Sequence, residues 1–310
     1  METVHVPILV APIVSSLLEP FHRLPADAPS HWLVDCTLGG GGHTAAFLEA
    51  FAREPSLSRH RVVSFDQDES AIERAKQRFA AEIAAGRLEV IHSRFSEAVP
   101  HLQDRAVLGL MADLGFSSDQ LEDSGRGLSF QREGPLDMRL DPTRGFSARE
   151  YLTDASEKQI ADALFELGEE RFSRKIAGAI VESRQRKQLP TTTTALAELV
   201  TYAVPPAARH GRIHAATRTF QALRILVNQE LEELDCLLDR VIIGLRPGGR
   251  VAILSFHSLE DRRVKQVFKN REGPFHALTK KPQEADEEEI RRNPRSRSAK
   301  LRIAERRGSE

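Results

Sequence analysis

The sequence predicts an α/β fold, a doubly wound, Rossmann-like parallel sheet interrupted by an inserted all-helical domain. Short apolar segments rich in β-branched residues alternate with segments of helical periodicity, which is typical of a parallel sheet. A run of four glycines at 39–42 lies between an apolar strand and a helical segment. The alternation stops near residue 117 and gives way to helical patterns, which indicates an insertion.

The ends of the predicted strands place the candidate site. Strands are expected at 32–34, 61–66, 88–91, 106–111 and 250–255. Ligands of parallel sheets bind beyond the carboxyl ends of the strands. Gly41, Asp66, Phe95 and Asp113 follow or end four of these segments, so they are expected on one rim.

The glycine stretch at 35–44, DCTLGGGGHT, is the part around which the chain is organised. A strand, a glycine turn and a helix let the backbone pass close to a nucleotide-like ligand. A glycine-rich surface turn is the alternative, and the flanking strand and helix disfavour it. Gly40, Gly42 and Ala45 also satisfy the looser dinucleotide pattern G-x-G-x-x-A, so a nicotinamide-dependent oxidoreductase stays open at this stage.

Polar residues at the strand ends count against a dehydrogenase. Asp35 and Thr37 can hold the charged amino-acid end of S-adenosylmethionine, and Asp113 lies where aminomethyltransferases place an acceptor for the target amine. Asp66 is expected to accept hydrogen bonds from ribose hydroxyls, whereas Asp66 or Asp68 can instead cap the helix at about 70–85. Phe95 is expected against adenine or in the core.

Composition bounds the class of protein. The chain has 310 residues, 40% of them hydrophobic and 29% charged, which is typical of a globular protein. No apolar run approaches the roughly 18 residues of a membrane span. Cys36 and Cys236 form no Cys-x-x-Cys pair, and residues 1–5 do not resemble a signal peptide, so a cytoplasmic location without a zinc site is expected. The net charge of −1 leaves nucleic-acid binding to local patches.

The expected domains are a discontinuous core, 1–116 and 217–310, and a helical insertion, 117–216. The insertion contains a polar stretch at 117–141 and helices near 156–167, 169–188 and 194–204. The middle helix carries basic residues that either meet phosphates or form a solvated face. Beyond the insertion we expect one long helix at 217–245, an S-x-x-D capping box at Ser258 and Asp261, and an edge strand or RNA-facing arm at 300–305.

Six blocks in order along the chain closely resemble the RsmH (MraW) family of bacterial S-adenosylmethionine-dependent methyltransferases. They are 35–44 (DCTLGGGGHT), 113–121 (DLGFSSDQL), 134–139 (GPLDMR), 216–224 (ATRTFQALR), 255–261 (SFHSLED) and 293–300 (NPRSRSAK). The resemblance implies a class I methyltransferase sheet, an RNA-facing insertion, and transfer of a methyl group to N4 of a cytidine in the decoding centre of 16S rRNA. This methyl transfer requires no metal ion.

The resemblance also implies which residues form the site. Cofactor contacts are expected at Gly41, Gly42, His43, Asp66, Phe95, Asp113 and Gln120, and Asp113 is also the candidate catalytic residue. The sequence departs from the family at Cys36, where Gly is usual, at Asp119, where Pro is usual, and near Ala215 and Ala216. The implied partner is 16S rRNA within the small ribosomal subunit, and a homodimer stays open. A non-enzymatic RNA-binding assembly factor is the third reading.

Overall fold

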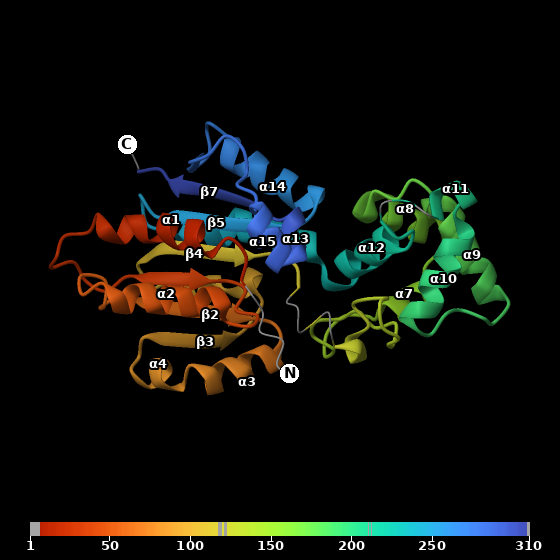
Figure 1. The fold of residues 1–310 in the computed structure, drawn as a ribbon, viewed down its shortest axis with the longest axis horizontal. Helices are drawn as coiled ribbons and strands as arrows, with labels where there is room; N and C mark the ends of the chain where they lie inside the picture. Colours follow the sequence, from red (N-terminus) through yellow and green to blue (C-terminus); the bar gives the residue numbers. More distant parts are fainter. Residues whose placement is uncertain (1–6, 117–119, 121–122, 210, 212, 309–310) are drawn as a thin grey trace. The chain divides into compact units, whose positions relative to one another are not determined.

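The computed structural model describes residues 7–116, 120, 123–209, 211 and 213–308 (Figure 1). It has a mixed α/β fold around a seven-stranded sheet with the order β3-β2-β1-β4-β5-β7-β6. The chain forms two compact units: unit 1 comprises 1–115 and 231–310, and unit 2 comprises 116–230. Each is described by itself.

The sheet of unit 1 confirms the predicted parallel strands. They are β1 (Trp32–Asp35), β2 (Arg61–Asp66), β3 (Leu88–His92), β4 (Val107–Asp113) and β5 (Arg250–Ser255). The last strand, β7 (Lys300–Arg306), runs antiparallel between β5 and β6 (Phe275–Ala277). The strand expected at 300–305 is confirmed, but its expected position at the edge was wrong, because β6 lies outside it, and the segment does not form an RNA-facing arm. Arg302 on β7 is buried and forms a bidentate ion pair with Asp261.

Helices cover both faces of this sheet, as a doubly wound fold requires. Neighbouring residues on one strand enter opposite cores: Leu33 packs in one cluster and Val34 in the other. The helices of unit 1 are α1 (Val10–His22), α2 (Gly42–Arg53), α3 (Glu69–Arg78), α4 (Ala80–Ala84), α5 (Val99–Leu102), α14 (Ser258–Lys269) and α15 (Glu287–Arg292), with α13 (Glu230–Cys236) beginning at the boundary.

The cap of α14 differs from the expected box. His257 and Glu260 form it, with the Glu260 N–H donating to His257 Nδ1 and the Glu260 carboxylate accepting from the His257 N–H. Asp261 does not fill the role predicted for it because its carboxylate is bound to Arg302. Ser258 is the first residue of the helix.

Unit 2 is helical and has its own apolar core. It contains α7 (Ala148–Asp154), α8 (Glu157–Gly168), α9 (Ser173–Gln185), α10 (Thr193–Ala203), α11 (Pro206–Arg209) and α12 (Thr217–Asn228). The insertion was expected to end at 216, whereas this unit runs to Glu230, because Phe220 and Leu223 of α12 are buried in its core. The expected single helix at 217–245 is also broken, because Gln229 has a φ of 53°.

The polar stretch before α7 folds back on itself through two glycines. A Cβ on Gly127, whose φ is +66°, would lie 1.7 Å from the Pro135 carbonyl oxygen. A Cβ on Gly134 would lie 2.0 Å from the Ser124 carbonyl oxygen. The two backbones therefore cross at a distance that only glycine allows. The buried amide of Asn228 clamps the same stretch through the Met138 carbonyl and the Leu140 N–H, both at 2.8 Å.

Gly127→Ala should destabilise unit 2, because the added Cβ would collide with the Pro135 carbonyl oxygen. That oxygen belongs to the backbone of the crossing segment, which cannot move away without breaking the crossing. We expect a loss of about 2–4 kcal/mol in the free energy of unfolding. The control is Gly145→Ala, which has nearly the same φ, +65°, but nothing within 4 Å of the added Cβ. Urea unfolding followed by far-ultraviolet circular dichroism checks this, and equal losses in both variants would contradict the collision.

Candidate functional site

The glycine turn after β1 has a shape that its neighbours enforce. Gly39 and Gly41 have φ values of +50° and +73°. A Cβ on Gly41 would lie 2.7 Å from the ring of Phe79, and a Cβ on Gly42 would lie 2.8 Å from the ring of Pro7. Larger residues at both positions would therefore displace the turn that starts α2.

The Asp35 side chain stabilises this turn through hydrogen bonds to residues on both sides of the glycines. Its side chain is 1% exposed and accepts hydrogen bonds from the Thr37 N–H at 3.1 Å and from Thr44 Oγ1 at 2.7 Å. Thr44 Oγ1 also lies 2.8 Å from Ser64 Oγ on β2. Burial raises the pKa of Asp35, while His43 and these hydrogen bonds oppose the rise. The Asp35 carboxylate is thus a support for the turn.

Asp66 ends β2 and joins the turn to the next helix. Its Oδ2 accepts from the Gly39 N–H at 2.7 Å and its Oδ1 from the Asp68 N–H at 2.8 Å. Asp68 caps α3 by accepting from the Ser70 N–H, so capping falls to Asp68. Burial raises the pKa of Asp66 to about 6. Each Asp66 oxygen keeps a further lone pair for a hydroxyl donor.

Asp113 and His43 form the most unusual pair on the rim. The Asp113 N–H donates to Thr37 Oγ1 at 2.7 Å, which joins the end of β4 to the glycine turn. Asp113 Oδ2 lies 3.7 Å from His43 Nδ1, and His43 Nε2 donates to the Ile8 carbonyl at 3.0 Å. Asp113 Oδ1 is buried and has no hydrogen-bond partner among the described residues.

Three acids lie at this rim. Burial raises the pKa of Asp113 to about 6, with His43 and Arg295 opposing the rise and the negative charge of Asp35 adding to it. Asp35 likewise raises the pKa of Asp66. These three acids end β1, β2 and β4, which are adjacent in the sheet. Such a rim favours a ligand with positive charge and hydrogen-bond donors, and disfavours the anionic pyrophosphate of a dinucleotide.

The two remaining predicted contacts lie in different surroundings. Phe95 follows β3 at the start of a short 3₁₀ helix, Phe95–Glu97, and its half-buried ring packs against one core of the sheet. Gln120 is buried and belongs to unit 2. Residues 117–119 and 121 of the same motif, Asp119 included, lie outside the described residues. The cofactor roles of Phe95 and Gln120, and of Gly41, Gly42 and His43, stay predictions.

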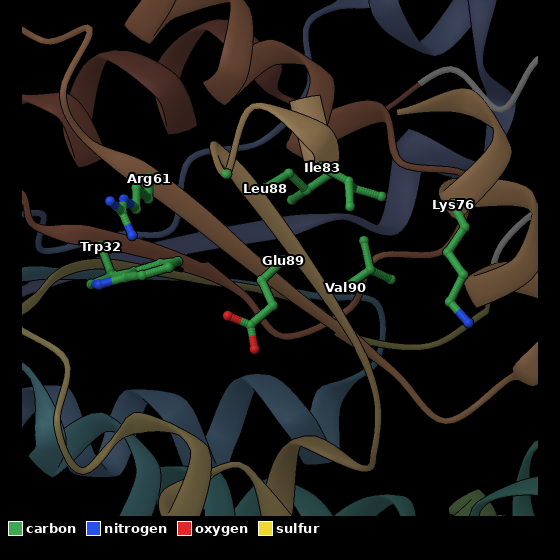
Figure 2. Close-up of a pocket in the computed structure, with 8 residues that line it drawn as sticks. Trp32, Arg61, Lys76, Ile83, Leu88, Glu89 and Val90 are labelled. Atoms are coloured by element: carbon green, nitrogen blue, oxygen red, sulfur yellow. The ribbon is translucent and has the colours of Figure 1, made fainter. Parts of the chain in front are cut away.

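A cavity of about 420 Å³ lies at the opposite end of the strands (Figure 2). Trp32, Arg61 and Leu88, the first residues of β1, β2 and β3, line it. The Arg105 guanidinium lies 4.3 Å from the centre of the Trp32 ring and pairs with Glu89. The rim lies at the carboxyl ends of the strands, where ligands of parallel sheets bind. This cavity lies at the amino ends and is therefore separate from the rim.

Sequence reasoning did not find the supporting role of Thr44 and Ser64. Thr44 is nine residues beyond Asp35, and Ser64 lies within an otherwise apolar strand. A polar residue inside a buried strand was the available signal, because a buried hydroxyl requires a partner. The sequence does not show which residue is the hydrogen-bond partner of that hydroxyl.

Comparison with known proteins identifies the family. The model of the MraW methylase family matches residues 2–307. The chain belongs to this family. A ribosomal RNA small subunit methyltransferase H from Prochlorococcus marinus is 44% identical over 304 residues, which cover 98% of this chain and 94% of that protein. The protein of the same name from Nostoc punctiforme is 48% identical over 280 residues, 89% of this chain and 88% of the relative.

Among the described residues, no helix has the length and apolar character needed to cross a membrane.

Asp113→Asn should stabilise the free MraW-family protein above pH 6. The folded pKa of about 6 exceeds the ordinary value of 3.8, so the folded state binds the proton more tightly than the unfolded state. The Asp113 charge therefore costs stability above pH 6, and this cost disappears as the pH falls towards 4. We expect a gain of roughly 1–3 kcal/mol at pH 8 that shrinks by pH 5.

Urea unfolding followed by the fluorescence of Trp32, the one tryptophan of the chain, reports on unit 1. The exposed Asp27 supplies the matched control, and Asp27→Asn should show no such gain. A gain for Asp113→Asn that is the same at pH 8 and pH 5 would contradict the titration.

Proposed function

We propose that the chain transfers a methyl group from S-adenosylmethionine to N4 of a cytidine in the decoding centre of 16S rRNA. The observation that carries the proposal is the match of the MraW methylase family to residues 2–307. Relatives that cover nearly the whole chain have names that specify methylation of small-subunit ribosomal RNA. The residue-level family resemblance supplies the N4 position and the decoding centre.

The donor and acceptor groups of the rim fit S-adenosylmethionine. The cofactor carries a sulfonium, an ammonium and two ribose hydroxyls, and the rim offers carboxylate acceptors. Asp66 has lone pairs for ribose hydroxyls, and Asp113 Oδ1 is a buried acceptor with no partner among the described residues. When bound, the cofactor supplies an activated methyl group on a positively charged sulfur.

The residues of the chain would act by positioning and by accepting a proton. An exocyclic amine of cytosine is a poor nucleophile because its lone pair is conjugated with the ring. Asp113 Oδ1 can accept a hydrogen bond from the amine. This bond would direct the lone pair of the amine nitrogen out of conjugation with the ring and towards the methyl group. Methylation leaves an extra proton on nitrogen, and the Asp113 carboxylate, with its pKa near 6, can take it. Thr37 fixes the backbone of Asp113 for this role.

The alternatives are weaker. A nicotinamide-dependent oxidoreductase would place a pyrophosphate near Asp35, Asp66 and Asp113, and the family match does not favour it. A non-enzymatic assembly factor would retain the fold without needing the chemistry of Asp113. An Asp113→Ala variant that binds RNA normally and preserves all cellular function would favour that reading. A cytoplasmic location and action on 16S rRNA within the small subunit follow from the proposed reaction.

Methyl transfer should occur at one cytidine. The protein is incubated with labelled S-adenosylmethionine and small ribosomal subunits from cells that lack the enzyme, and the label is located by nucleoside analysis. We expect label on N4 of a single cytidine. Transfer to a ring carbon or to a ribose hydroxyl would contradict the proposed function.

Asp66→Ala should weaken binding of S-adenosylmethionine about 10- to 100-fold, the usual range for a charge-assisted hydrogen bond. Glu69→Gln is the control, because Glu69 is an exposed acid three residues further along the chain. Wild-type affinity should also fall as the pH drops through about 6, because protonation removes the acceptor form of Asp66. Isothermal titration at pH 7.5 and 5 measures both effects, and equal wild-type affinity at both values would rule out the carboxylate contact.

A further inference from the structure

The basic helix α9 was expected either to meet phosphates or to form a solvated face, and three cations in or beside it make contacts within unit 2. Arg184 donates to three carbonyl oxygens at the end of α7, at 2.8–2.9 Å. Arg186 pairs with Glu182. The guanidinium of Arg171, just before the helix, lies 4.7 Å from the centre of the neighbouring Phe172 ring. These contacts do not exclude RNA binding by α9, but a second surface of unit 2 combines a held guanidinium with a largely exposed aromatic ring.

The chain from 199 to 229 has an unusual charge pattern. It contains no Asp or Glu, although the whole chain has 45 acids among 310 residues. Arginine and histidine recur along the same stretch. A segment with positive charge and no acid attracts a polyanion even when the net charge of the protein is −1.

Tyr202 and Arg209 form a fixed pair within this segment. Tyr202, near the end of α10, is 73% exposed. The Arg209 guanidinium donates to the Tyr202 carbonyl at 3.1 Å and to the Val204 carbonyl at 3.3 Å. These bonds place it 5.6 Å from the centre of the Tyr202 ring. The guanidinium lies over the Tyr202 ring, and an exposed aromatic ring with a held guanidinium is an arrangement that binds a base and its phosphate.

A second ring in the segment is held in a similar manner. The exposed His214 ring packs on Phe130, with ring centres 4.8 Å apart. Its Nδ1 accepts from the Ala216 N–H at 3.2 Å, so in the neutral ring Nε2 carries the proton. Ile213 next to it is 51% exposed. Preorganised exposed rings occur at two places in one acid-free segment, which favours an aromatic, anionic partner.

We propose that Tyr202 is a stacking platform for an unpaired base of the substrate RNA, and that Arg209 contacts a phosphate beside that base. This inference rests on the proposed function and names the surface that binds the substrate. Stacking on tyrosine accepts any base, so the pair supplies affinity and leaves the choice of target cytidine to the rim. The proposal adds the segment of α10 and α11 to the surfaces of unit 2 that are expected to meet RNA.

The test compares methyl transfer to small ribosomal subunits by wild type, Tyr202→Ala and Tyr202→Phe. Tyr202→Ala should raise the KM for subunits about tenfold, within the range of one base–aromatic stack, and leave kcat unchanged. Tyr202→Phe keeps the ring and should match wild type. Circular dichroism should be the same for all three proteins, because the exposed Tyr202 side chain contributes little to the core.

Phe165→Ala is the matched control. Phe165 is 62% exposed on α8, but Asp162, Glu166 and Glu169 flank it in sequence, so its removal should not change KM. An unchanged KM for Tyr202→Ala, in a wild type that methylates subunits, would overturn this inference alone. A wild type that transfers no methyl group would instead overturn the proposed function.

A photo-crosslinking residue at position 202 identifies the partner. In the complex with small subunits, the full-length protein should crosslink to 16S rRNA. Crosslinking to a ribosomal protein alone would overturn the assignment to RNA, even if KM rises.

Discussion

The buried carboxylate of Asp35 is the interaction on which the rim depends. It accepts from Thr37 and Thr44, and Thr44 in turn contacts Ser64 on β2, so one carboxylate connects β1, the glycine turn, α2 and β2. Thr37 passes the constraint to the end of β4 through the N–H of Asp113. Loss of the Asp35 carboxylate would leave these donors unsatisfied, at roughly 1–3 kcal/mol for each buried group.

The same network makes the free protein electrostatically unfavourable at the place where it is expected to act. Burial raises the pKa of both Asp66 and Asp113, and the negative charge of Asp35 adds to the rise. Asp113 Oδ1 has no partner among the described residues. A cationic ligand that donates hydrogen bonds would relieve both costs at once. In the proposed function, binding of such a cofactor would relieve the unfavourable energy of the free site.

Local signals predicted the parallel sheet, the insertion and the residues at the strand ends, because strand alternation and glycine runs are short-range properties. The failures involve contacts between distant residues. The alternation at 300–305 was interpreted as an edge strand or an arm, but Arg302 is buried in an ion pair with Asp261, and the cap of α14 is formed by His257 and Glu260. The site roles of Phe95 and Gln120 stay predictions, because no periodicity indicates whether a ring or amide meets a ligand or the core.

The net charge of −1 conceals two opposite charge distributions on one chain. Acids converge at the ends of β1, β2 and β4, whereas the segment from 199 to 229 in unit 2 has none. The proposed methyl transfer from a cationic cofactor to a polyanionic RNA would use both distributions. If acids extended along the whole chain, RNA would be repelled. The acids at the strand ends belong to unit 1 and the acid-free segment belongs to unit 2, so the net charge of the whole chain reveals neither.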